Sequence, residues 1–321
     1  MELLYKMIIQ KELRQLEDML SSSISSDINL ATEVSQYVVG SGGKRIRPVI
    51  CILVAKMLNY KGSELIKLAS SIELLHTATL IHDDVVDQSS TRRGKESIHK
   101  KWDNSHGVLV GDFVYSKAFQ LMASLDNPEI IRILADSTNR ISEGEVLQLS
   151  LKKREILSKR DYFEIIDRKT AELFKASAIT AGSLACCNEE EFVSLTKFAI
   201  SLGKNFQIKD DLLDYFGDEE LTGKKLGKDF EEGKFTLPLI TALPLMSQEH
   251  KSMILEIIFG KNKSDFKEIV KIIKDTGAIE KVEEICNEFS KTCFNELKTF
   301  PKSDYKTALI NILDNINTRV S

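Results

Sequence analysis

The sequence predicts an all-α protein, and three observations support that class. Only 5 of the 321 residues are proline and 16 are glycine, so few residues interrupt a helix. Apolar residues recur at spacings of three and four, as in Leu65, Leu68, Ala69, Ile72 and Leu75. The period-two alternation that marks half-buried strands is rare. We therefore expect helices through most of the chain and almost no β-structure.

Short breaks divide the predicted helices in chain order. They lie at residues 21–27, 40–43, 92–96, 126–128 and 217–233. Apolar stripes over residues 65–80 and 269–282 mark two of the helices between them. None of the breaks is a Ser- or Pro-rich linker of the kind that separates domains. Although 321 residues are enough for two domains, we expect one domain over residues 1–321.

Charge and hydropathy exclude several classes of function. The 44 Lys and Arg against 48 Asp and Glu give a net charge of −4, so no broad basic surface for nucleic acid or anionic membranes is expected. The longest apolar run covers residues 49–55, far short of the roughly 20 residues that cross a bilayer. Charged residues near the N-terminus leave no visible signal peptide. We expect a cytoplasmic protein without a transmembrane segment.

Two acidic motifs with identical aspartate spacing, DDVVD and DDLLD, carry aspartates at positions i, i+1 and i+4: Asp83, Asp84, Asp87, Asp210, Asp211 and Asp214. On a helix these positions fall within 100°, so the three carboxylates of each motif would share one face. Like charges four residues apart repel, so helix stability does not explain the motifs. Clustered carboxylates suit Mg²⁺, which shares its coordination sphere with phosphate oxygens. The alternative is a solvated acidic face, and the exact repetition of the motif argues against it.

Cations gather in or near glycine-containing turns, and several of these turns could bind anions. The positions are Lys44, Arg45, Arg47, Arg92, Arg93, Lys169, Lys224 and Lys234. Pro48 follows the first group, and we expect a helix to begin there. Each cation alone is more often a solvated charge, but together with the acidic motifs they predict a ligand with condensed phosphates. The P-loop spacing GxxxxGK[ST] is absent from the sequence, which disfavours nucleotide hydrolysis.

These residues resemble the signature of the trans-isoprenyl diphosphate synthases. The resemblance covers GGKRIRP (42–48), HTATLIHDDVVDQSSTRRG (76–94), GDFVYSKAF (111–119), SEGEVLQL (142–149), KTAELF (169–174), FQIKDDLLDYFGD (206–218) and GKFTLP (233–238). Within that family the sequence is most similar to the bacterial long-chain type, the octaprenyl diphosphate synthases that make quinone side chains. The resemblance implies a single-domain bundle of long helices around a deep central cavity, assembled as a homodimer.

The resemblance also implies a role for each site residue. The Mg²⁺ ions that bridge an allylic diphosphate would be held by Asp83, Asp87 and Asp210. The other aspartates of the two motifs would complete the acidic clusters. Lys169 would be a catalytic residue together with these aspartates. The residues that would contact the allylic diphosphate are Arg92, Lys169, Thr170, Gln207, Lys224 and Lys234. Those that would hold isopentenyl diphosphate are Lys44, Arg47, His76 and Arg93.

The implied reaction is the Mg²⁺-dependent, head-to-tail condensation of isopentenyl diphosphate onto an allylic diphosphate, such as farnesyl diphosphate. The product would be a long all-trans polyprenyl diphosphate, and the alternative is a shorter-chain farnesyl or geranylgeranyl diphosphate synthase. A class I terpene cyclase would be expected to carry a mixed Asn/Ser/Glu second motif instead of DDLLD. A non-catalytic partner subunit would be expected to have lost aspartates or arginines of the signature.

Product length is expected to depend on the helix that carries the first acidic motif. Thr79 and Ala78 precede Asp83 by four and five residues, which is about 6 and 7.5 Å along the helix axis. In shorter-chain members of the family these positions often carry aromatic side chains that close the cavity. Their small size here predicts a product of about six to ten isoprene units, most simply eight, with Phe119 or Met122 as the floor of the cavity.

Overall fold

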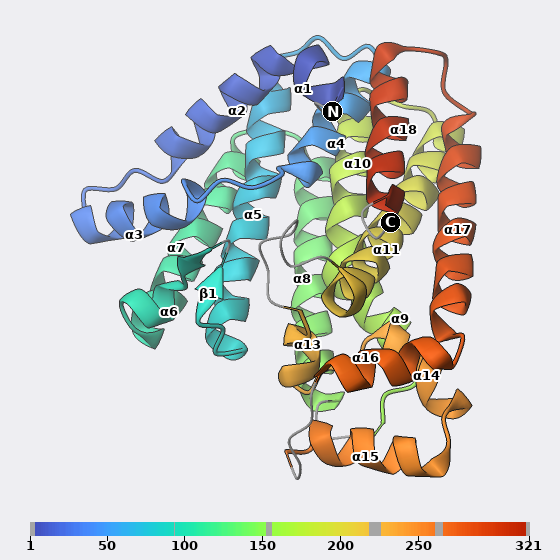
Figure 1. The fold of residues 1–321 in the computed structure, drawn as a ribbon. Coiled ribbons are helices and arrows are strands. Elements are labelled where there is room, and N and C mark those ends of the chain that lie inside the picture. The colour runs from blue at the N-terminus through green and yellow to red at the C-terminus, as the bar shows by residue number, and fades with distance from the viewer. Residues whose placement is uncertain (1–3, 93, 152–155, 218–225, 261–265, 319–321) are drawn as a thin grey trace. The chain divides into compact units, whose positions relative to one another are not determined.

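The computed structural model describes residues 4–92, 94–151, 156–217, 226–260 and 266–318, and most of these residues are helical (Figure 1). The prediction of an all-α protein is confirmed. Within the described residues the only strands are β1 (Thr91–Arg92) and β2 (Lys95–Glu96), which pair antiparallel inside one predicted break. Across the same residues, no helix combines the length and the apolarity that a membrane crossing requires.

The chain packs into two compact units, each assembled from three stretches of sequence. Unit 1 comprises Met1–Thr138, Leu173–Thr196 and Leu297–Asn311. Unit 2 comprises Asn139–Glu172, Lys197–Glu296 and Ile312–Ser321. Several boundaries fall inside helices instead of loops, so no linker of sequence separates the units. The single domain over residues 1–321 stays a prediction.

Unit 1 contains most of the N-terminal helices: α1 (Leu4–Ile8), α2 (Gln10–Ser23), α3 (Asn29–Val39), α4 (Ile46–Met57), α5 (Glu64–Val86), α6 (Ile98–Lys101) and α7 (Asn104–Ala123). The predicted breaks at 21–27, 40–43 and 126–128 match the gap between α2 and α3, the gap between α3 and α4, and the end of α7. The breaks between α4 and α5 and between α6 and α7 were not predicted. Nearly all of α10 (Glu172–Leu184) belongs to the same unit, as do the first parts of α8 (Pro128–Leu151), α11 (Glu189–Phe216) and α18 (Asp304–Asn317).

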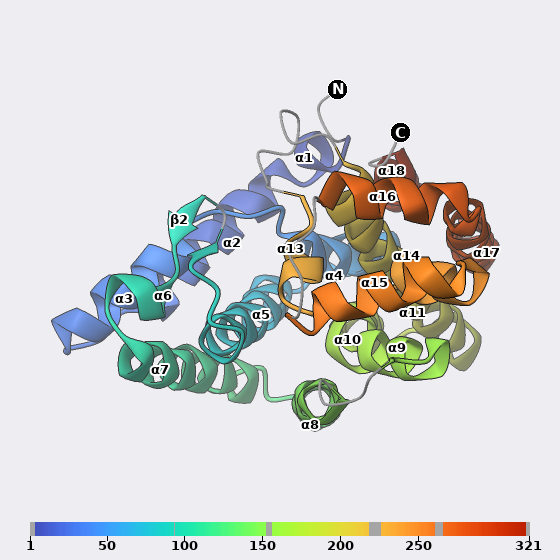
Figure 2. The same cartoon turned by 60° about the horizontal axis from the view of Figure 1, so that its bottom comes forward.

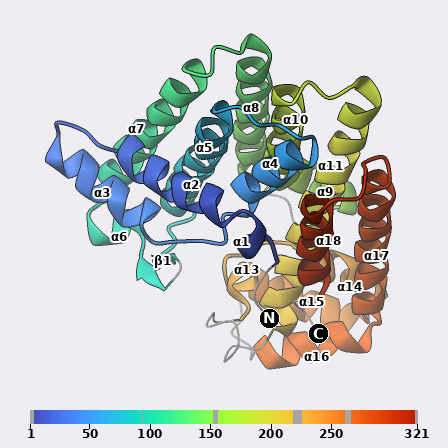
Figure 3. The ribbon, with the colours of Figure 1, turned by 90° about the horizontal axis from the view of Figure 1, so that it is seen from above.

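Helices α5 and α7 lie side by side in unit 1 (Figure 3). Two glycines of α7 make this close approach possible. A Cβ atom at Gly107 would overlap the Val85 side chain, and one at Gly111 would overlap the His82 ring. Because α5 carries the first acidic motif, its packing against α7 fixes the place of that motif within the unit.

Helix α4 begins two residues earlier than predicted, at Ile46, and Pro48 lies in its first turn. Proline is tolerated there because the first N–H groups of a helix have no intrahelical partner. The preceding residue, Arg45, adopts φ = 49° in the left-handed region, which is costly for a residue other than glycine. Surrounding contacts must therefore stabilise this conformation.

The guanidinium of Arg45 is buried and supplies those contacts. It donates to Glu73 of α5 at 2.8 Å, to Glu17 of α2 at 2.8 Å and to the carbonyl of Val39 at 2.9 Å. The side chain of Glu73 is 3% exposed, whereas that of Glu17 is 53% exposed. These bonds fix the glycine-containing loop that also carries Lys44.

Unit 2 contains α9 (Lys159–Ile166), the π-helical turn η1 (Asp167–Ala171), α13 (Lys228–Glu231), α14 (Leu237–Ala242), η2 (Leu243–Leu245), α15 (Gln248–Ile258), α16 (Phe266–Asp275) and nearly all of α17 (Ala278–Leu297). A capping box between Ser158 and Asp161 starts α9. Helices α14, α15 and α16 gather at one end of the unit (Figure 2). The predicted stripe over residues 269–282 forms the buried faces of α16 and the start of α17.

The two carboxylates that contact Arg45 should differ in their effect on stability. Glu73→Ala removes a buried partner and should lower the free energy of unfolding by roughly 3 kcal/mol. Glu17→Ala, the matched control at the exposed partner, should cost less than about 1 kcal/mol. Urea denaturation of both variants measures the difference, and equal losses would contradict the assignment of Glu73 as the main partner.

Candidate active site

The first acidic motif lies at the end of α5 in unit 1. Its helical conformation is confirmed through Val86, with Asp87 as the residue that follows the helix. Asp84 is 6% exposed and turns inward, while Asp83 is half-buried. The shared face of the three carboxylates stays a prediction. The Arg92 guanidinium forks onto Asp84, with Nε 2.9 Å from each carboxylate oxygen and Nη2 2.6 Å from Oδ1. Arg93 lies outside the described residues.

Two predicted residues of the isopentenyl diphosphate site meet in unit 1. Arg47 Nη1 lies 2.9 Å from Nε2 of His76. The same guanidinium stacks over the ring of Phe174, 4.8 Å from its centroid. Phe174 had no predicted role, and its position in the motif KTAELF is the signal that could have identified it. Lys44 lies in the loop before α4, where its carbonyl accepts from the Tyr5 hydroxyl at 3.5 Å.

The predicted chain-length residues lie on α5 with different exposure. Ala78 is fully buried, and Thr79 is half-buried with its hydroxyl donating to the His76 carbonyl at 2.8 Å. A small pocket of unit 1 is lined on this helix by Thr77, Leu80, Ile81 and Asp84. Of the two candidates for the floor on α7, Phe119 is exposed and Met122 is fully buried.

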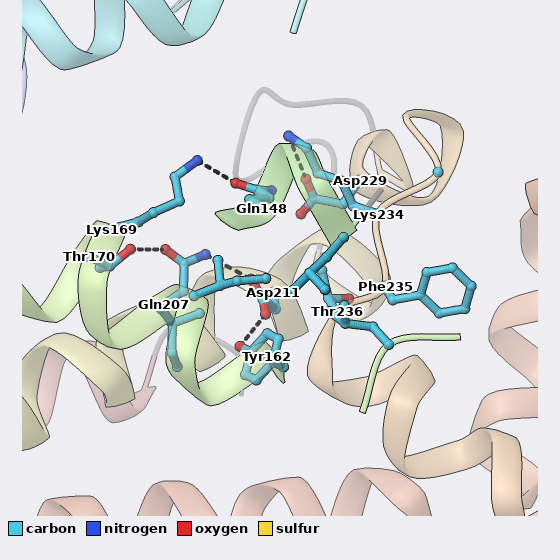
Figure 4. A pocket seen from close by; sticks show the side chains of 15 residues that line it. Gln148, Tyr162, Lys169, Thr170, Gln207, Asp211, Asp229, Lys234, Phe235 and Thr236 are labelled. Carbon is cyan, nitrogen blue, oxygen red and sulfur yellow. Dashed lines mark hydrogen bonds and ion pairs between the residues drawn. The ribbon is translucent and has the colours of Figure 1, made fainter. Parts of the chain in front are cut away.

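A larger pocket opens in unit 2 and gathers many predicted ligand-binding residues (Figure 4). Apolar side chains of α8 and α9 form part of its wall: Leu151, Ile165 and Ile166. The polar and charged residues that line it are Gln148, Tyr162, Lys169, Thr170, Gln207, Asp211, Asp229, Lys234 and Thr236. The structure thus brings five predicted residues together: Lys169, Thr170, Gln207, Asp211 and Lys234. Lys224 lies outside the described residues, and Asp210 and Asp214 are not part of this lining.

A π-helical turn places two consecutive residues, Lys169 and Thr170, in the pocket lining. Such turns are rare and occur mostly at functional sites. Gly144 of α8 allows the turn to pack closely, since a Cβ there would lie 2.7 Å from the Cβ of Arg168. The ammonium group of Lys169 donates to Gln148 at 2.5 Å and pairs with Glu145 at 2.6 Å. These partners belong to the segment SEGEVLQL, which the resemblance included without assigning roles.

A chain of hydrogen bonds links the pocket residues of unit 2. The Thr170 hydroxyl donates to Oε1 of Gln207 at 2.9 Å, and Nε2 of Gln207 donates to Oδ1 of Asp211 at 2.8 Å. The hydroxyl of Tyr162 donates to Oδ2 of the same aspartate at 2.5 Å. Tyr162 lies outside every motif of the resemblance, so the sequence offered no signal for its role.

The remaining aspartates of the second motif differ from Asp211 in their surroundings. Asp210 is exposed. The carboxylate of Asp214 accepts from the backbone N–H groups of Lys228 and Asp229 at 3.1 and 3.0 Å. It therefore holds the start of α13 and, with it, the segment that leads to Lys234.

Negative charge accumulates around the second motif. Burial raises the pKa of the Asp211 carboxyl well above its usual range, and the charges of Asp229 and Asp210 raise it further. Burial and the charge of Asp229 also raise the pKa of Asp214 to about 6. The pKa of Asp229 is raised by burial, although Lys234 opposes the shift. Because the ionised form of these carboxyls is unfavourable, a nearby cation would stabilise it.

The helical fold and these acidic and basic sites are typical of an enzyme that acts on diphosphate substrates. The sequence model of the family described as polyprenyl synthetase matches residues 28–276, and the chain belongs to that family. It is a prenyltransferase of the polyprenyl diphosphate synthase class with the all-α isoprenoid synthase fold.

Individual relatives agree with this assignment. The chain is 39% identical to octaprenyl diphosphate synthase of Escherichia coli over 290 residues, which cover 90% of each chain. A polyprenyl synthase from Caulobacter crescentus, crystallised with calcium and isoprenyl diphosphate, superimposes with a TM-score of 0.94 at 32% identity and covers 99% of this chain and 98% of its own. A decaprenyl diphosphate synthase from Rhodobacter capsulatus gives a TM-score of 0.93 at 32% identity, with the same coverage.

The hydrogen bond from Tyr162 to Asp211 should contribute measurably to stability. Tyr162→Phe leaves one oxygen of a buried carboxylate without its donor and should lower the free energy of unfolding by about 1–3 kcal/mol. The matched control is Tyr37→Phe, because the hydroxyl of Tyr37 bonds the carbonyl of Glu96 at 3.0 Å in an exposed position. That control should change stability by less than about 0.5 kcal/mol. Similar losses in thermal melts of the two variants would show that Tyr162 does not support Asp211.

Proposed function

We propose that this prenyltransferase adds isopentenyl diphosphate repeatedly, head to tail, to an allylic diphosphate and releases a long all-trans polyprenyl diphosphate. The observation that carries the proposal is the unit 2 pocket, where Lys169, Thr170, Gln207 and Lys234 gather beside the second acidic motif. Their N–H and O–H donors suit diphosphate oxygens. The direct test is incubation of the purified chain with Mg²⁺, farnesyl diphosphate and labelled isopentenyl diphosphate, followed by sizing of the products.

The similarity to an octaprenyl and a decaprenyl diphosphate synthase supports a long product, and eight isoprene units is the length we favour. A shorter-chain synthase is the less favoured alternative. The deep central cavity, the homodimer, the cytoplasmic location and the use of the product in quinone side chains stay predictions.

The acidic motifs fit divalent metal ions, and we assign Mg²⁺ to them. The donors are hard carboxylate oxygens. The pKa values around the second motif are raised by burial first and by repulsion between carboxylates second, and a bound cation would relieve both. Among the described residues no three acidic, His or Cys side chains form a complete metal cage. Each Mg²⁺ usually takes one or two carboxylates together with substrate phosphates, and we assign Asp83, Asp87 and Asp210 as the carboxylate ligands of the Mg²⁺ ions.

The chemistry requires stabilisation of a leaving group and exclusion of water. The allylic C–O bond breaks, and hydrogen bonds from Lys169 and Lys234 of the unit 2 pocket stabilise the negative charge that grows on the diphosphate. Bound Mg²⁺ would stabilise the same developing charge. The double bond of isopentenyl diphosphate then forms the new C–C bond, and the departing diphosphate takes the proton that is lost. Apolar pocket walls protect the carbocation from water.

Isopentenyl diphosphate is assigned to Arg47, His76 and Lys44, with Arg93 from outside the described residues. The guanidinium of Arg47 is held by Phe174 on its face and by His76 at its edge. Such a guanidinium is already ordered before an anion binds, which lowers the entropy cost of binding.

Both acidic motifs should be needed for turnover. Asp83→Ala and Asp210→Ala should each lower kcat by at least ~100-fold, which is about 2.7 kcal/mol of transition-state stabilisation. Asp112→Ala, which removes an exposed carboxylate of α7, is the control and should leave kcat within about twofold. Near-normal turnover of either motif variant at saturating Mg²⁺ would refute the metal assignment.

The two diphosphate sites should separate in kinetics. Arg47→Ala should raise the KM for isopentenyl diphosphate by at least ~10-fold, and Lys169→Ala should do the same for the allylic substrate. Arg47→Lys should also be impaired because an ammonium group does not replace a planar guanidinium. If both alanine variants affect both substrates equally, the division of the sites is wrong.

Product length should respond to the size of residue 78. Ala78→Tyr should shorten the products to about three or four isoprene units and preserve the first condensation, since its ring lies about 7.5 Å along the axis from Asp83. Because Ala78 is fully buried, Thr79→Tyr at the half-buried neighbouring position provides a second variant. Sizing of products from folded variants is the measurement. Unchanged length in both, or a wild-type product of only three or four units, would contradict the open cavity.

A further inference from the structure

The second aspartate of each acidic motif differs from its neighbours in the same way in both units. Asp84 is 6% exposed and Asp211 is 2% exposed. Both oxygens of each carboxylate accept hydrogen bonds from protein side chains. The two motifs lie on different helices and have different partners, so the repeated pattern comes from two independent sites.

In unit 1 the partner of Asp84 is a residue assigned to diphosphate binding. Nε and Nη2 of Arg92 both donate to Asp84, at 2.6–2.9 Å. These two groups lie on one edge of the planar guanidinium, so the edge formed by Nη1 faces away from the carboxylate. A forked contact fixes the plane of the guanidinium as well as its position. Asp84 thereby determines the direction in which Arg92 can donate to an anion.

In unit 2 the partner of Asp211 is again a residue assigned to diphosphate binding. Oδ1 of Asp211 accepts from Nε2 of Gln207, which directs Oε1 of that amide to the hydroxyl of Thr170. The other oxygen accepts from Tyr162. The hydrogen-bond network therefore sets which end of the Gln207 amide faces Thr170.

We propose that Asp84 and Asp211 are positioning residues that each fix the orientation of a residue assigned to diphosphate binding, Arg92 in unit 1 and Gln207 in unit 2, and that they do not ligate metal. The proposal rests on the proposed function, and it divides each motif between two tasks. Asp83, Asp87 and Asp210 are the ligands of the metal ions. To ligate metal as well, Asp84 would have to weaken charge-assisted bonds that already occupy both of its oxygens.

The test compares the isosteric variants Asp84→Asn and Asp83→Asn with Arg92→Gln and the double variant Asp84→Asn/Arg92→Gln. The matched control is Asp136→Asn, which weakens another Asp–Arg pair of unit 1, the exposed contact with Arg132 at 4.0 Å. Three quantities are measured: the KM for farnesyl diphosphate, the KM for isopentenyl diphosphate, and the Mg²⁺ concentration at half-maximal rate. Calorimetric titration of Mn²⁺ in the presence of farnesyl thiolodiphosphate reports metal binding without turnover, and thermal melts identify unfolded variants.

We expect Asp84→Asn to raise the KM for farnesyl diphosphate by at least ~10-fold, with the KM for isopentenyl diphosphate and the metal requirement within about twofold of wild type. Arg92→Gln should have the same profile, and the double variant should be no worse than Arg92→Gln, because both changes disrupt one interaction. Asp83→Asn should instead weaken Mn²⁺ binding by at least ~10-fold. The control should match wild type throughout.

Weakened Mn²⁺ binding in folded Asp84→Asn, similar to that in Asp83→Asn, would overturn the proposal, as would additive effects in the double variant. If Asp84→Asn does not fold, Arg92→Gln still tests the partner, and an unchanged KM for farnesyl diphosphate would refute the role of the pair. In unit 2, Asp211→Asn and Asp210→Asn should show the same contrast in metal binding. A wild-type chain that forms no product would refute the proposed function itself, independently of these comparisons.

Discussion

The cost of burying charge beside charge is the constraint on which the sites of this protein depend. An ionised carboxylate in a low-dielectric interior is stable only when donors or cations surround it. Asp211 is almost completely buried, with Asp210 and Asp229 nearby, and its pKa is raised accordingly. Tyr162 and Gln207 offset part of that cost through hydrogen bonds. The part of the burial cost that these hydrogen bonds do not offset favours the binding of a cation beside Asp211.

In unit 1 the buried guanidinium of Arg45 and the half-buried guanidinium of Arg92 follow the same rule with the signs reversed. Arg45 is held by Glu73 and Glu17, and Arg92 by Asp84. Each pair fixes a segment that carries other functional groups: the loop of Lys44 in one case and the short β1–β2 hairpin in the other. Residues that form structural ion pairs therefore occur in the same sequence motifs as residues assigned to substrate binding.

Much of the fold and part of the candidate site could be predicted because the signals are local. Scarce proline and apolar spacing predicted helices, and three predicted breaks match the ends of α2, α3 and α7 to within a few residues. The breaks between α4 and α5 and between α10 and α11 were not predicted. The motifs predicted Arg47, His76, Lys169 and Asp211 as site residues, and the structure brings the first two together in unit 1 and the last two into the unit 2 pocket. Phe174 and Tyr162 were missed, since an aromatic residue in a helix is usually part of the core and only its spatial partner distinguishes it.

The sequence by itself determined the all-α class, the two helices that carry the aspartates and the family of the enzyme, because helical periodicity and motif spacing are properties of contiguous residues. Only the tertiary structure decided which aspartates turn inward. The angular spacing of 100° per residue places Asp83 and Asp84 on adjacent faces, and the surrounding packing determines which face is buried. Arg92 lies 8 residues from Asp84 and Tyr162 lies 49 residues from Asp211, so no helical spacing rule could have assigned these two partners. Gln207 lies four residues before Asp211 on α11, at the spacing where helical side chains meet.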